Sequence, residues 1–193
     1  VEALTLSRGG RVLFEGLSFA AAPGAYVEVQ GSNGSGKTSL LRAIAGLMRP
    51  RAGRIAFENV EEPALALHYV GHANAVKREA SVSDHVRYWR GLFGARYDEV
   101  GGLAAFGLRH QADLPVRVLS QGQARRLALM RLDIAQRPIW VLDEPAAALD
   151  ADGRAMLSRF IDAHCLNGGI AIAAVHEPLG PAPTQSIWIG GAA

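Results

Sequence analysis

The sequence predicts a single α/β domain with a mostly parallel sheet, an N-terminal antiparallel β portion and a helical insertion. Short apolar segments, such as residues 139–143 and 170–175, alternate with helical patterns in the second half of the chain. This alternation is typical of a parallel sheet covered by helices on both faces. Residues 3–30 read instead as short strands separated by turns, and a glycine-rich loop then joins an apolar strand to a helix.

The elements follow in order from hydrophobic spacing and turn signals. Strands are expected at residues 3–6, 12–14, 17–21, 26–30, 54–57, 67–71, 139–143 and 170–175. Helices are expected at residues 39–48, from 81 to about 108, at 123–136 and at 151–167. We therefore expect one domain over residues 1–193, with a nucleotide-binding core (1–75 and 119–193) around a helical subdomain at about 76–118.

Composition limits the functional classes. With 193 residues and 49% hydrophobic residues, the chain has enough apolar side chains for one core. No segment approaches the roughly 18 consecutive apolar residues of a membrane span, and the N-terminus does not resemble a signal peptide. The single cysteine, Cys165, excludes an intrachain disulfide and is consistent with a reducing cytoplasm. A net charge of +2 gives no indication of a nucleic-acid partner. We expect a soluble chain that reaches a membrane only through partners.

The charge distribution is uneven. Residues 77–131 hold ten Lys or Arg but five Asp or Glu. Such a basic region could face anionic lipid head groups or phosphates. It could equally be an arginine-rich surface exposed to solvent, and the sequence leaves both interpretations open.

The glycine-rich loop has the pattern of a phosphate-binding loop. Residues 31–39 read G-S-N-G-S-G-K-T-S and match G-x-x-x-x-G-K-[ST] between an apolar strand and a helix. Its backbone amides and the helix N-terminus can bind phosphate oxygens. Lys37 can reach the β- and γ-phosphates, and the hydroxyl of Thr38 can ligate Mg²⁺. The candidate nucleotide-binding residues are Gly31, Ser32, Asn33, Gly34, Ser35, Gly36, Lys37, Thr38 and Ser39.

Two acids stand at the end of an apolar strand. In IWVLDEP, Asp143 and Glu144 follow four apolar residues. Because ligands bind at the carboxyl ends of the strands in open α/β sheets, both acids should lie beside the phosphate loop. We expect Asp143 to hold Mg²⁺ through water and Glu144 to orient and polarise the attacking water.

A third motif indicates which class of nucleotide-binding protein this is. Residues 119–123, L-S-Q-G-Q, resemble the LSGGQ signature of ABC ATPases, with Gln121 in place of the first glycine. The resemblance implies a head-to-tail homodimer in which each ATP lies between one chain's phosphate loop and the other's Ser120, Gln121, Gly122 and Gln123. It also implies that Asp150 lies in a loop at the dimer interface, and that His176, after an apolar strand, contacts the γ-phosphate.

The chain departs from the family pattern at several positions. His72 stands where the family usually has a glutamine that contacts Mg²⁺ or water, and imidazole is a poorer Mg²⁺ ligand than an amide oxygen. His72 either acts through water, makes a weakened contact, or is a solvent-facing residue. No tyrosine stands near Arg8, where the family often stacks adenine, so Arg8 is the candidate; Phe14 is a second one, with a core role as the alternative. Ala147 replaces a common Ser or Thr.

Longer segments are similar to a narrower group. GHANAVKREASVSDHVRYW, LSQGQARRLALMRL and RPIWVLDEPAAALD resemble the haem exporter ATP-binding subunits of bacterial cytochrome c maturation. The resemblance implies a peripheral ATPase on the cytoplasmic face of the inner membrane, with ATP and Mg²⁺ as cofactors and a polytopic membrane subunit as partner. The chain has no Cys-x-x-Cys-His motif, so we do not expect it to bind haem itself.

Three other interpretations compete with this one. The first is an ABC ATPase for another cargo, such as a small molecule or a lipid. The second is a soluble ABC-type protein of translation or DNA repair, which usually needs two linked domains or long coiled coils. The third is a P-loop kinase, which offers no role for LSQGQ.

Overall fold

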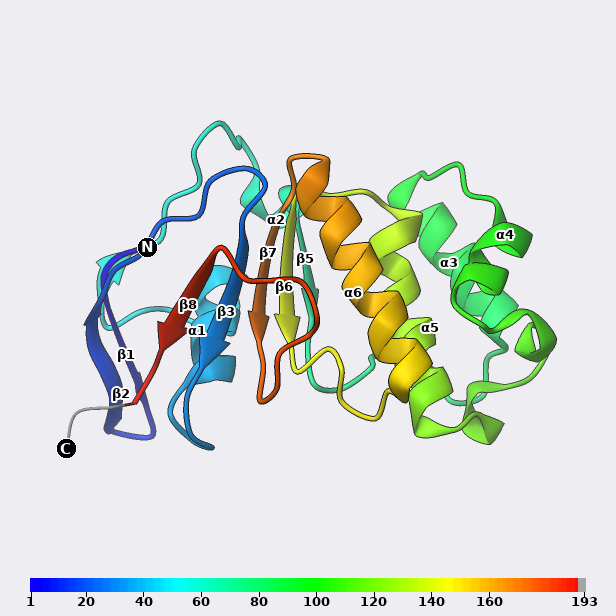
Figure 1. The fold of residues 1–193 in the computed structure, drawn as a ribbon, viewed down its shortest axis with the longest axis horizontal. Helices are drawn as coiled ribbons and strands as arrows, with labels where there is room; N and C mark the ends of the chain where they lie inside the picture. Colours follow the sequence, from blue (N-terminus) through cyan, green and yellow to red (C-terminus); the bar gives the residue numbers. More distant parts are fainter. Residues whose placement is uncertain (191–193) are drawn as a thin grey trace.

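The computed structural model describes residues 1–190, which form a five-stranded parallel sheet, a three-stranded antiparallel sheet and helices that pack around them (Figure 1). The strands in chain order are β1 (Glu2–Arg8), β2 (Arg11–Leu17), β3 (Tyr26–Gln30), β4 (Ala52–Arg54), β5 (Leu67–Val70), β6 (Ile139–Asp143), β7 (Ile170–Ala174) and β8 (Gln185–Trp188). The helices are α1 (Lys37–Ile44), α2 (Pro63–Ala66), α3 (Val82–Phe93), α4 (Glu99–Ala105), η1 (Arg109–Gln111), η2 (Val116–Val118), α5 (Gln121–Ile134) and α6 (Ala151–Leu166).

The sheet topology confirms the predicted fold class. The larger sheet has the order β5-β6-β7-β3-β8, and each neighbouring pair is parallel. The smaller sheet has the order β2-β1-β4, and both of its pairs are antiparallel. Figure 1 shows the smaller sheet at one end of the molecule and α3 and α4 at the other, with the parallel sheet between them.

Both faces of the parallel sheet are buried. In β6, Trp140 and Leu142 join a cluster that includes residues of α3, α5 and α6, whereas Ile139 and Val141 join a second cluster with residues of α1 and β1. Strands β3, β5, β6 and β7 supply apolar side chains to both layers, which explains the unbroken apolar run at the start of β6.

The helical region between β5 and α5 is stabilised by local signals. At the start of α3, Ser81 Oγ accepts a hydrogen bond from Asp84 N, and the Asp84 carboxylate accepts one from Ser81 N. This reciprocal capping box satisfies two amide donors at the start of the helix. The helix ends at Gly94, whose φ of 61° is left-handed. The subdomain boundaries at 76 and 118 stay a prediction.

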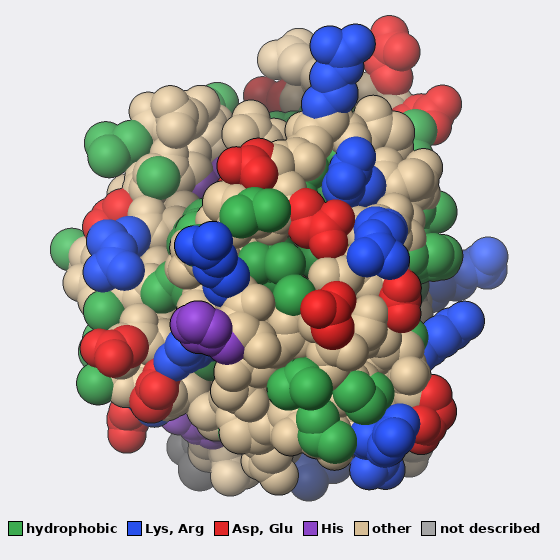
Figure 2. All heavy atoms as spheres, turned by 90° about the vertical axis from the view of Figure 1, so that its right-hand side faces the viewer, with side chains coloured by type: hydrophobic (Ala, Val, Ile, Leu, Met, Phe, Trp, Pro, Cys, Tyr) green, Lys and Arg blue, Asp and Glu red, His purple; other side chains and the backbone are tan. Residues whose placement is uncertain are grey.

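The surface of this end mixes charges of both signs. Figure 2 shows Lys and Arg side chains interspersed with Asp and Glu. Arg87 pairs with Asp84 at 3.2 Å, and Arg90 pairs with Glu99 at 3.7 Å. Arg125 is buried. These pairs favour the interpretation of a solvent-exposed arginine-rich surface over that of a dedicated basic face.

Two strand predictions need correction, and one strand was not predicted. The strand expected at residues 17–21 is wrong, because β2 extends to Leu17 through its pairing with β1, and residues 18–22 are irregular. The strand expected at 54–57 lies instead at β4, where the backbone of Gly53 lies against that of Ala3. Strand β8 was missed; its one buried residue, Ile187, gives a weak pattern, and the strand forms by parallel pairing with β3.

Within residues 1–190, no helix is long and apolar enough to cross a membrane.

Candidate active site

The carboxyl ends of four parallel strands bring the predicted residues together. The phosphate loop follows β3, His72 lies two residues beyond β5, Asp143 ends β6, and His176 follows β7. Because neighbouring parallel strands all end at the same edge, groups that are far apart in the sequence meet there.

Glycines and one lysine shape the phosphate loop. Gly31 and Gly36 have φ values of 146° and 113°, and a Cβ on Gly31 would collide with the carbonyl oxygen of Ile189. Lys37 is only 6% exposed, and its Nζ donates to the carbonyl oxygens of Gly31 at 2.7 Å and Ser32 at 3.2 Å. The ammonium group is thus held inside the loop at the N-terminus of α1, where the helix dipole also favours an anion.

A cavity of about 560 Å³ opens beside this loop, which is in the usual range for small-molecule sites. It is lined by Arg8, Leu13, Asn33, Gly34, Gly36, Lys37, Thr38, Ser39, Arg42, Glu144 and His176. The arginines, the lysine and the amides of the loop give it donors suited to phosphate groups. Arg8 lines this cavity, and its contact with adenine stays a prediction. Phe14 lies against Gly36 and packs on the second core cluster, which agrees with the alternative of a core role.

Asp143 and Thr38 are suited to a divalent cation. Thr38 Oγ1 donates to Asp143 Oδ1 at 3.0 Å, and Asp143 is 1% exposed. Within residues 1–190, its buried Oδ2 has no hydrogen-bond partner. Burial raises the pKa of this carboxyl, although the Thr38 hydrogen bond acts in the opposite direction. An orphaned carboxylate oxygen beside a hydroxyl fits Mg²⁺, which normally takes one or two protein oxygens together with phosphates and water.

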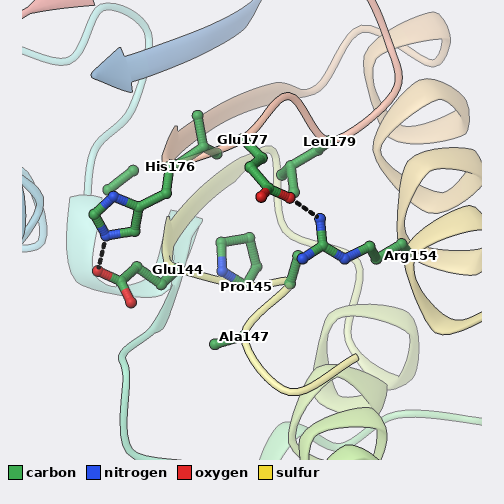
Figure 3. A pocket seen from close by; sticks show the side chains of 10 residues that line it. Glu144, Pro145, Ala147, Arg154, His176, Glu177 and Leu179 are labelled. Atoms are coloured by element: carbon green, nitrogen blue, oxygen red, sulfur yellow. Dashed lines mark hydrogen bonds and ion pairs between the residues drawn. The ribbon is translucent and has the colours of Figure 1, made fainter. Parts of the chain in front are cut away.

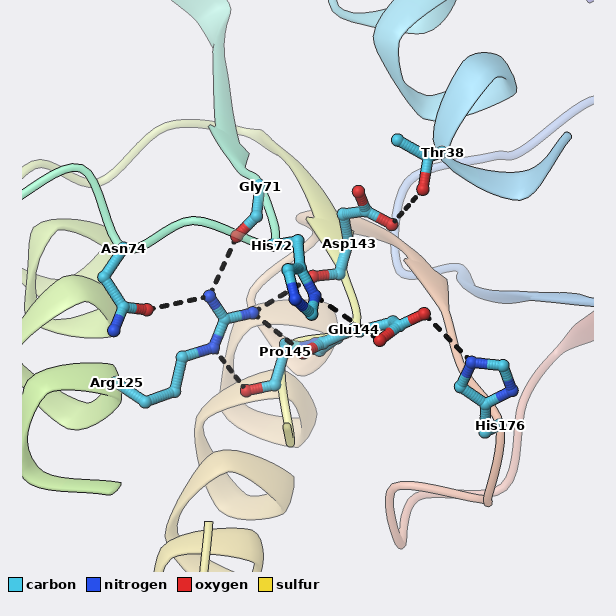
Figure 4. Close-up of polar contacts among 9 residues, drawn as sticks. All are labelled: Thr38, Gly71, His72, Asn74, Arg125, Asp143, Glu144, Pro145 and His176. Atoms are coloured by element: carbon cyan, nitrogen blue, oxygen red, sulfur yellow. Dashed lines mark hydrogen bonds and ion pairs between the residues drawn. The ribbon is translucent and has the colours of Figure 1, made fainter. Parts of the chain in front are cut away.

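Glu144 lies between two histidines. Its Oε1 is 2.9 Å from His176 Nε2, and its Oε2 is 3.5 Å from His72 Nδ1 (Figures 3 and 4). Figure 3 also shows Arg154 and Glu177 forming a separate ion pair on the other side of Pro145. The φ of Glu144 is 49°, a strained value for a residue with a side chain. His72 therefore contacts the candidate base, and its role as a Mg²⁺ ligand stays a prediction.

The signature residues begin α5 with a second capping box. Ser120 Oγ accepts from Gln123 N at 3.1 Å, and Ser120 N donates to Gln123 Oε1 at 2.9 Å. A Cβ on Gly122 would lie 2.8 Å from Ala148 O, so this position needs glycine. Gln121 is exposed, which explains why a side chain fits in place of the first glycine of the motif. Their contact with ATP stays a prediction.

The loop that ends in Leu149 and Asp150 packs against this turn. Asp150 caps α6 by accepting from Gly153 N at 2.9 Å, and it pairs with Arg126 of α5. These two interactions, the backbone bond first, hold the pKa of Asp150 below its usual value. Its predicted place at a dimer interface is not tested by a single chain.

The signature turn and the phosphate loop lie apart within one chain. Figure 1 shows the start of α5 beyond β6, on the other side of the molecule from α1. Within residues 1–190, Ser120, Gly122 and Gln123 do not line the cavity beside the phosphate loop.

The fold and this set of residues define a P-loop ATPase of the ABC transporter type. The pattern of the family described as "ABC transporter" matches residues 14–147, so the chain belongs to this family. A putative ABC transporter ATP-binding protein from Pyrococcus furiosus has the same fold, with a TM-score of 0.83 and 23% identity over 97% of this chain and 95% of that one. The cbiO1 chain from Clostridium perfringens, described as part of the ABC transporter complex cbiONQ, gives a TM-score of 0.72 and 25% identity over 92% and 77% of the two chains.

Within this family, the chain belongs with the CcmA export proteins. It is 47% identical over 190 residues to the cytochrome c biogenesis ATP-binding export protein CcmA of Rhodopseudomonas palustris strain HaA2, covering 96% of this chain and 94% of that protein. The resemblance read from the sequence is thereby confirmed, as is the prediction of an ABC-type ATPase.

Sequence reasoning missed several residues of the site. Arg42 lines the cavity, and Arg125 and Asn74 lie behind the acid pair. The sequence pattern could have indicated that Arg125 is buried, because Leu129 and Leu132 follow it at helical spacing on a buried face of α5. A charged residue in such a row indicates a buried polar contact.

Replacing Asp143 by Asn should stabilise the protein in the absence of nucleotide and Mg²⁺. A carboxyl with a raised pKa in the folded state stabilises the fold only at low pH, and that contribution is lost as the pH rises above its unfolded pKa. At pH 7 the amide removes the buried charge and still accepts from Thr38. We expect about 1 kcal/mol more stability, or about 2–4 °C in Tm.

Thermal unfolding at pH 4 and pH 8 tests this expectation, and Asp162→Asn on α6, outside the site, serves as the matched control. The gain from Asp143→Asn should be larger at pH 8 than at pH 4, because the raised pKa keeps more of the folded carboxyl protonated at pH 4. If Asp143→Asn had a lower Tm than the unaltered protein at pH 8, the raised pKa of the buried Asp143 carboxyl would be contradicted.

Proposed function

We propose that the chain hydrolyses ATP at this site, with Mg²⁺, and that hydrolysis energises the export step that delivers haem for c-type cytochrome biogenesis. The observation that carries the proposal is the position of Glu144. Its carboxylate lies between His176 and His72, at the edge of a cavity that also holds Lys37 and Thr38.

The residues of the chain divide the chemistry among them. Lys37 and the amides at the start of α1 bind the β- and γ-phosphates and stabilise charge as the terminal bond breaks. Thr38, and Asp143 through water, would hold Mg²⁺, which would neutralise phosphate charge. Glu144 orients the attacking water and accepts its proton. His176 fixes the Glu144 carboxylate and lies close enough to the cavity to contact the γ-phosphate.

A homodimer completes the site. The turn at Ser120 is a helix N-terminus with exposed polar groups, which is suited to an anion, but it lies away from its own chain's phosphate loop. We propose that two chains pair head to tail, so that the Ser120 turn of each caps the ATP bound by the other. Asp150 would then lie at the interface between them.

Membrane subunits are the proposed partners. The related cbiO1 chain belongs to a transporter complex, and the CcmA relatives are described as export proteins. We propose that this chain is a peripheral subunit on the cytoplasmic face of the bacterial inner membrane and docks on a polytopic partner. The haem would pass through that partner and not contact this chain.

Glu144→Gln should abolish turnover while ATP still binds. A positioned general base contributes about 10²–10⁴-fold, so we expect a loss of that size in kcat and little change in ATP affinity. Phosphate release and equilibrium binding of ATP measure the two quantities. Glu177→Gln, next to the site but paired with Arg154, is the matched control and should keep full activity. Full turnover by Glu144→Gln would show that another group acts as the base.

Ser120→Arg should remove one ATP per altered chain from the dimer. In a Glu144→Gln background, which prevents turnover, differently tagged chains can be mixed and the mixed dimers isolated. We expect two ATP in unaltered dimers and one in mixed dimers, because each Ser120 turn serves the partner's nucleotide. Ser186→Arg, at an exposed position of β8, is the control. Mixed dimers that hold two ATP would exclude the composite site.

Two experiments test whether haem is the cargo: identification of the membrane partner, and measurement of haem attachment to c-type cytochromes. Purification of the tagged chain from native membranes, followed by mass spectrometry, should recover a polytopic subunit. In a strain that carries Lys37→Ala as its only copy, covalent haem attachment to c-type cytochromes should fail. If attachment were normal while ATP hydrolysis was lost, the cargo would be a different one.

A further inference from the structure

The guanidinium of Arg125 lies behind the acid pair and is fully engaged. The residue is 2% exposed and comes from the first turns of α5 (Figure 4). The group makes five hydrogen bonds to acceptors of two separate segments, residues 71–74 and 143–145. Nε donates to Pro145 O (3.0 Å), Nη1 to Gly71 O (2.8 Å) and Asn74 Oδ1 (3.2 Å), and Nη2 to Asp143 O (3.0 Å) and Glu144 O (2.8 Å).

These acceptors are all neutral. Four are backbone carbonyls and one is a side-chain amide, so no carboxylate pairs directly with the buried cation. Burial lowers the pKa of Arg125, although the nearby charges of Asp143 and Glu144 act against this effect. A buried charge of this kind costs desolvation energy, and packed apolar side chains are often at least as stabilising. The arrangement is therefore better explained by what it positions than by stability alone.

Arg125 joins its own helix, α5, to these two segments, and the proposed catalysis needs all three at fixed relative positions. The carbonyls of Asp143, Glu144 and Pro145 fix the backbone on both sides of Glu144, whose φ of 49° is strained. Gly71 and Asn74 lie on either side of His72, which contacts the Glu144 carboxylate. The third segment is α5 itself, which begins at Ser120. Through one planar group, the start of α5 is joined rigidly to both.

We propose that Arg125 is a positioning residue that couples the Ser120 turn to Glu144 and to the His72 segment. This inference rests on the proposed function, in which the Ser120 turn meets the partner's ATP. A shift of α5 on closure of the dimer would move Arg125 and, through its carbonyl contacts, place the Glu144 carboxylate for attack. The general base would then reach its working position only when ATP is capped in trans.

Lysine cannot replace arginine in this role. Its ammonium is a single point with three donors, whereas the guanidinium presents five in a fixed planar fork. Arg125→Lys therefore keeps the charge but cannot make all five contacts to the two segments. Since a misplacement of about 1 Å can cost about 10²-fold in rate, we expect kcat for ATP to fall about 10–100-fold, with little change in KM.

Arg131→Lys is the matched control. Arg131 lies on the same helix, and burial lowers its pKa to about 10, but it makes no contact with the acid pair. The full chain with its co-purified membrane subunits should be assayed for ATP hydrolysis and thermal unfolding. The two variants should have similar Tm values, and only Arg125→Lys should lose kcat.

A double-mutant cycle separates positioning from a merely structural role. If Arg125 acts through Glu144, Arg125→Lys should add almost no further loss of single-turnover rate in a Glu144→Gln background. A structural role would multiply the two losses. If Arg125→Lys does not fold, Asn74→Ala decides instead, because it removes a single bond from a loop and should lower kcat severalfold at unchanged Tm.

The outcomes distinguish the two proposals. Absence of ATP hydrolysis in the unaltered complex would overturn the proposed function and this inference with it. Normal hydrolysis in the unaltered complex, with equal kcat for Arg125→Lys and Arg131→Lys, or multiplicative losses in the cycle, would overturn the coupling role of Arg125 alone.

Discussion

Burial of both faces of the parallel sheet dictates where this protein can place polar chemistry. Strands β6 and β7 supply apolar side chains to both core clusters, so charged groups are excluded from their central positions. The carboxyl edge is different, because the chain leaves the sheet there and the backbone can turn. The phosphate loop, the acid pair and the two histidines all occupy this edge. The sheet thus aligns groups that are more than a hundred residues apart, such as Thr38 and Asp143.

Two buried polar side chains and one strained backbone position at this edge are expected to cost stability. Asp143 and Lys37 are almost fully buried, and Glu144 has a left-handed backbone. None of these features improves packing, and strain and buried charge are typical of sites organised for catalysis. The hydrogen bonds of Lys37 to the loop carbonyls and of Arg125 to the strand-end carbonyls offset part of this cost. Burial of apolar side chains in the surrounding core offsets the rest of this loss of stability.

The surface that carries the signature turn is held by contacts within the chain. The capping box fixes Ser120 and Gln123, Gly122 lies close to Ala148, and Asp150 joins α5 to α6 through Arg126. This surface is therefore ordered before any partner binds, so little conformational entropy would be lost on association. Arg125, at the base of the same turn, extends this order inward to the acid pair.

The local motifs could be recognised in the sequence because their chemistry requires particular residues at fixed spacing. The structure places Glu144 and His176 at the cavity beside residues 31–39, and Asp143 next to Thr38, because the acids and His176 stand at the ends of apolar strands. Their roles in binding and catalysis stay predictions. The sequence by itself thus determined the class of fold and the nucleotide loop. Only the tertiary structure decided the pairing of β8 with β3, the contact of His72 with Glu144, and the five hydrogen bonds of Arg125. These depend on which distant segments come into contact, and hydrogen bonds to backbone carbonyls leave no residue-specific pattern in a single sequence.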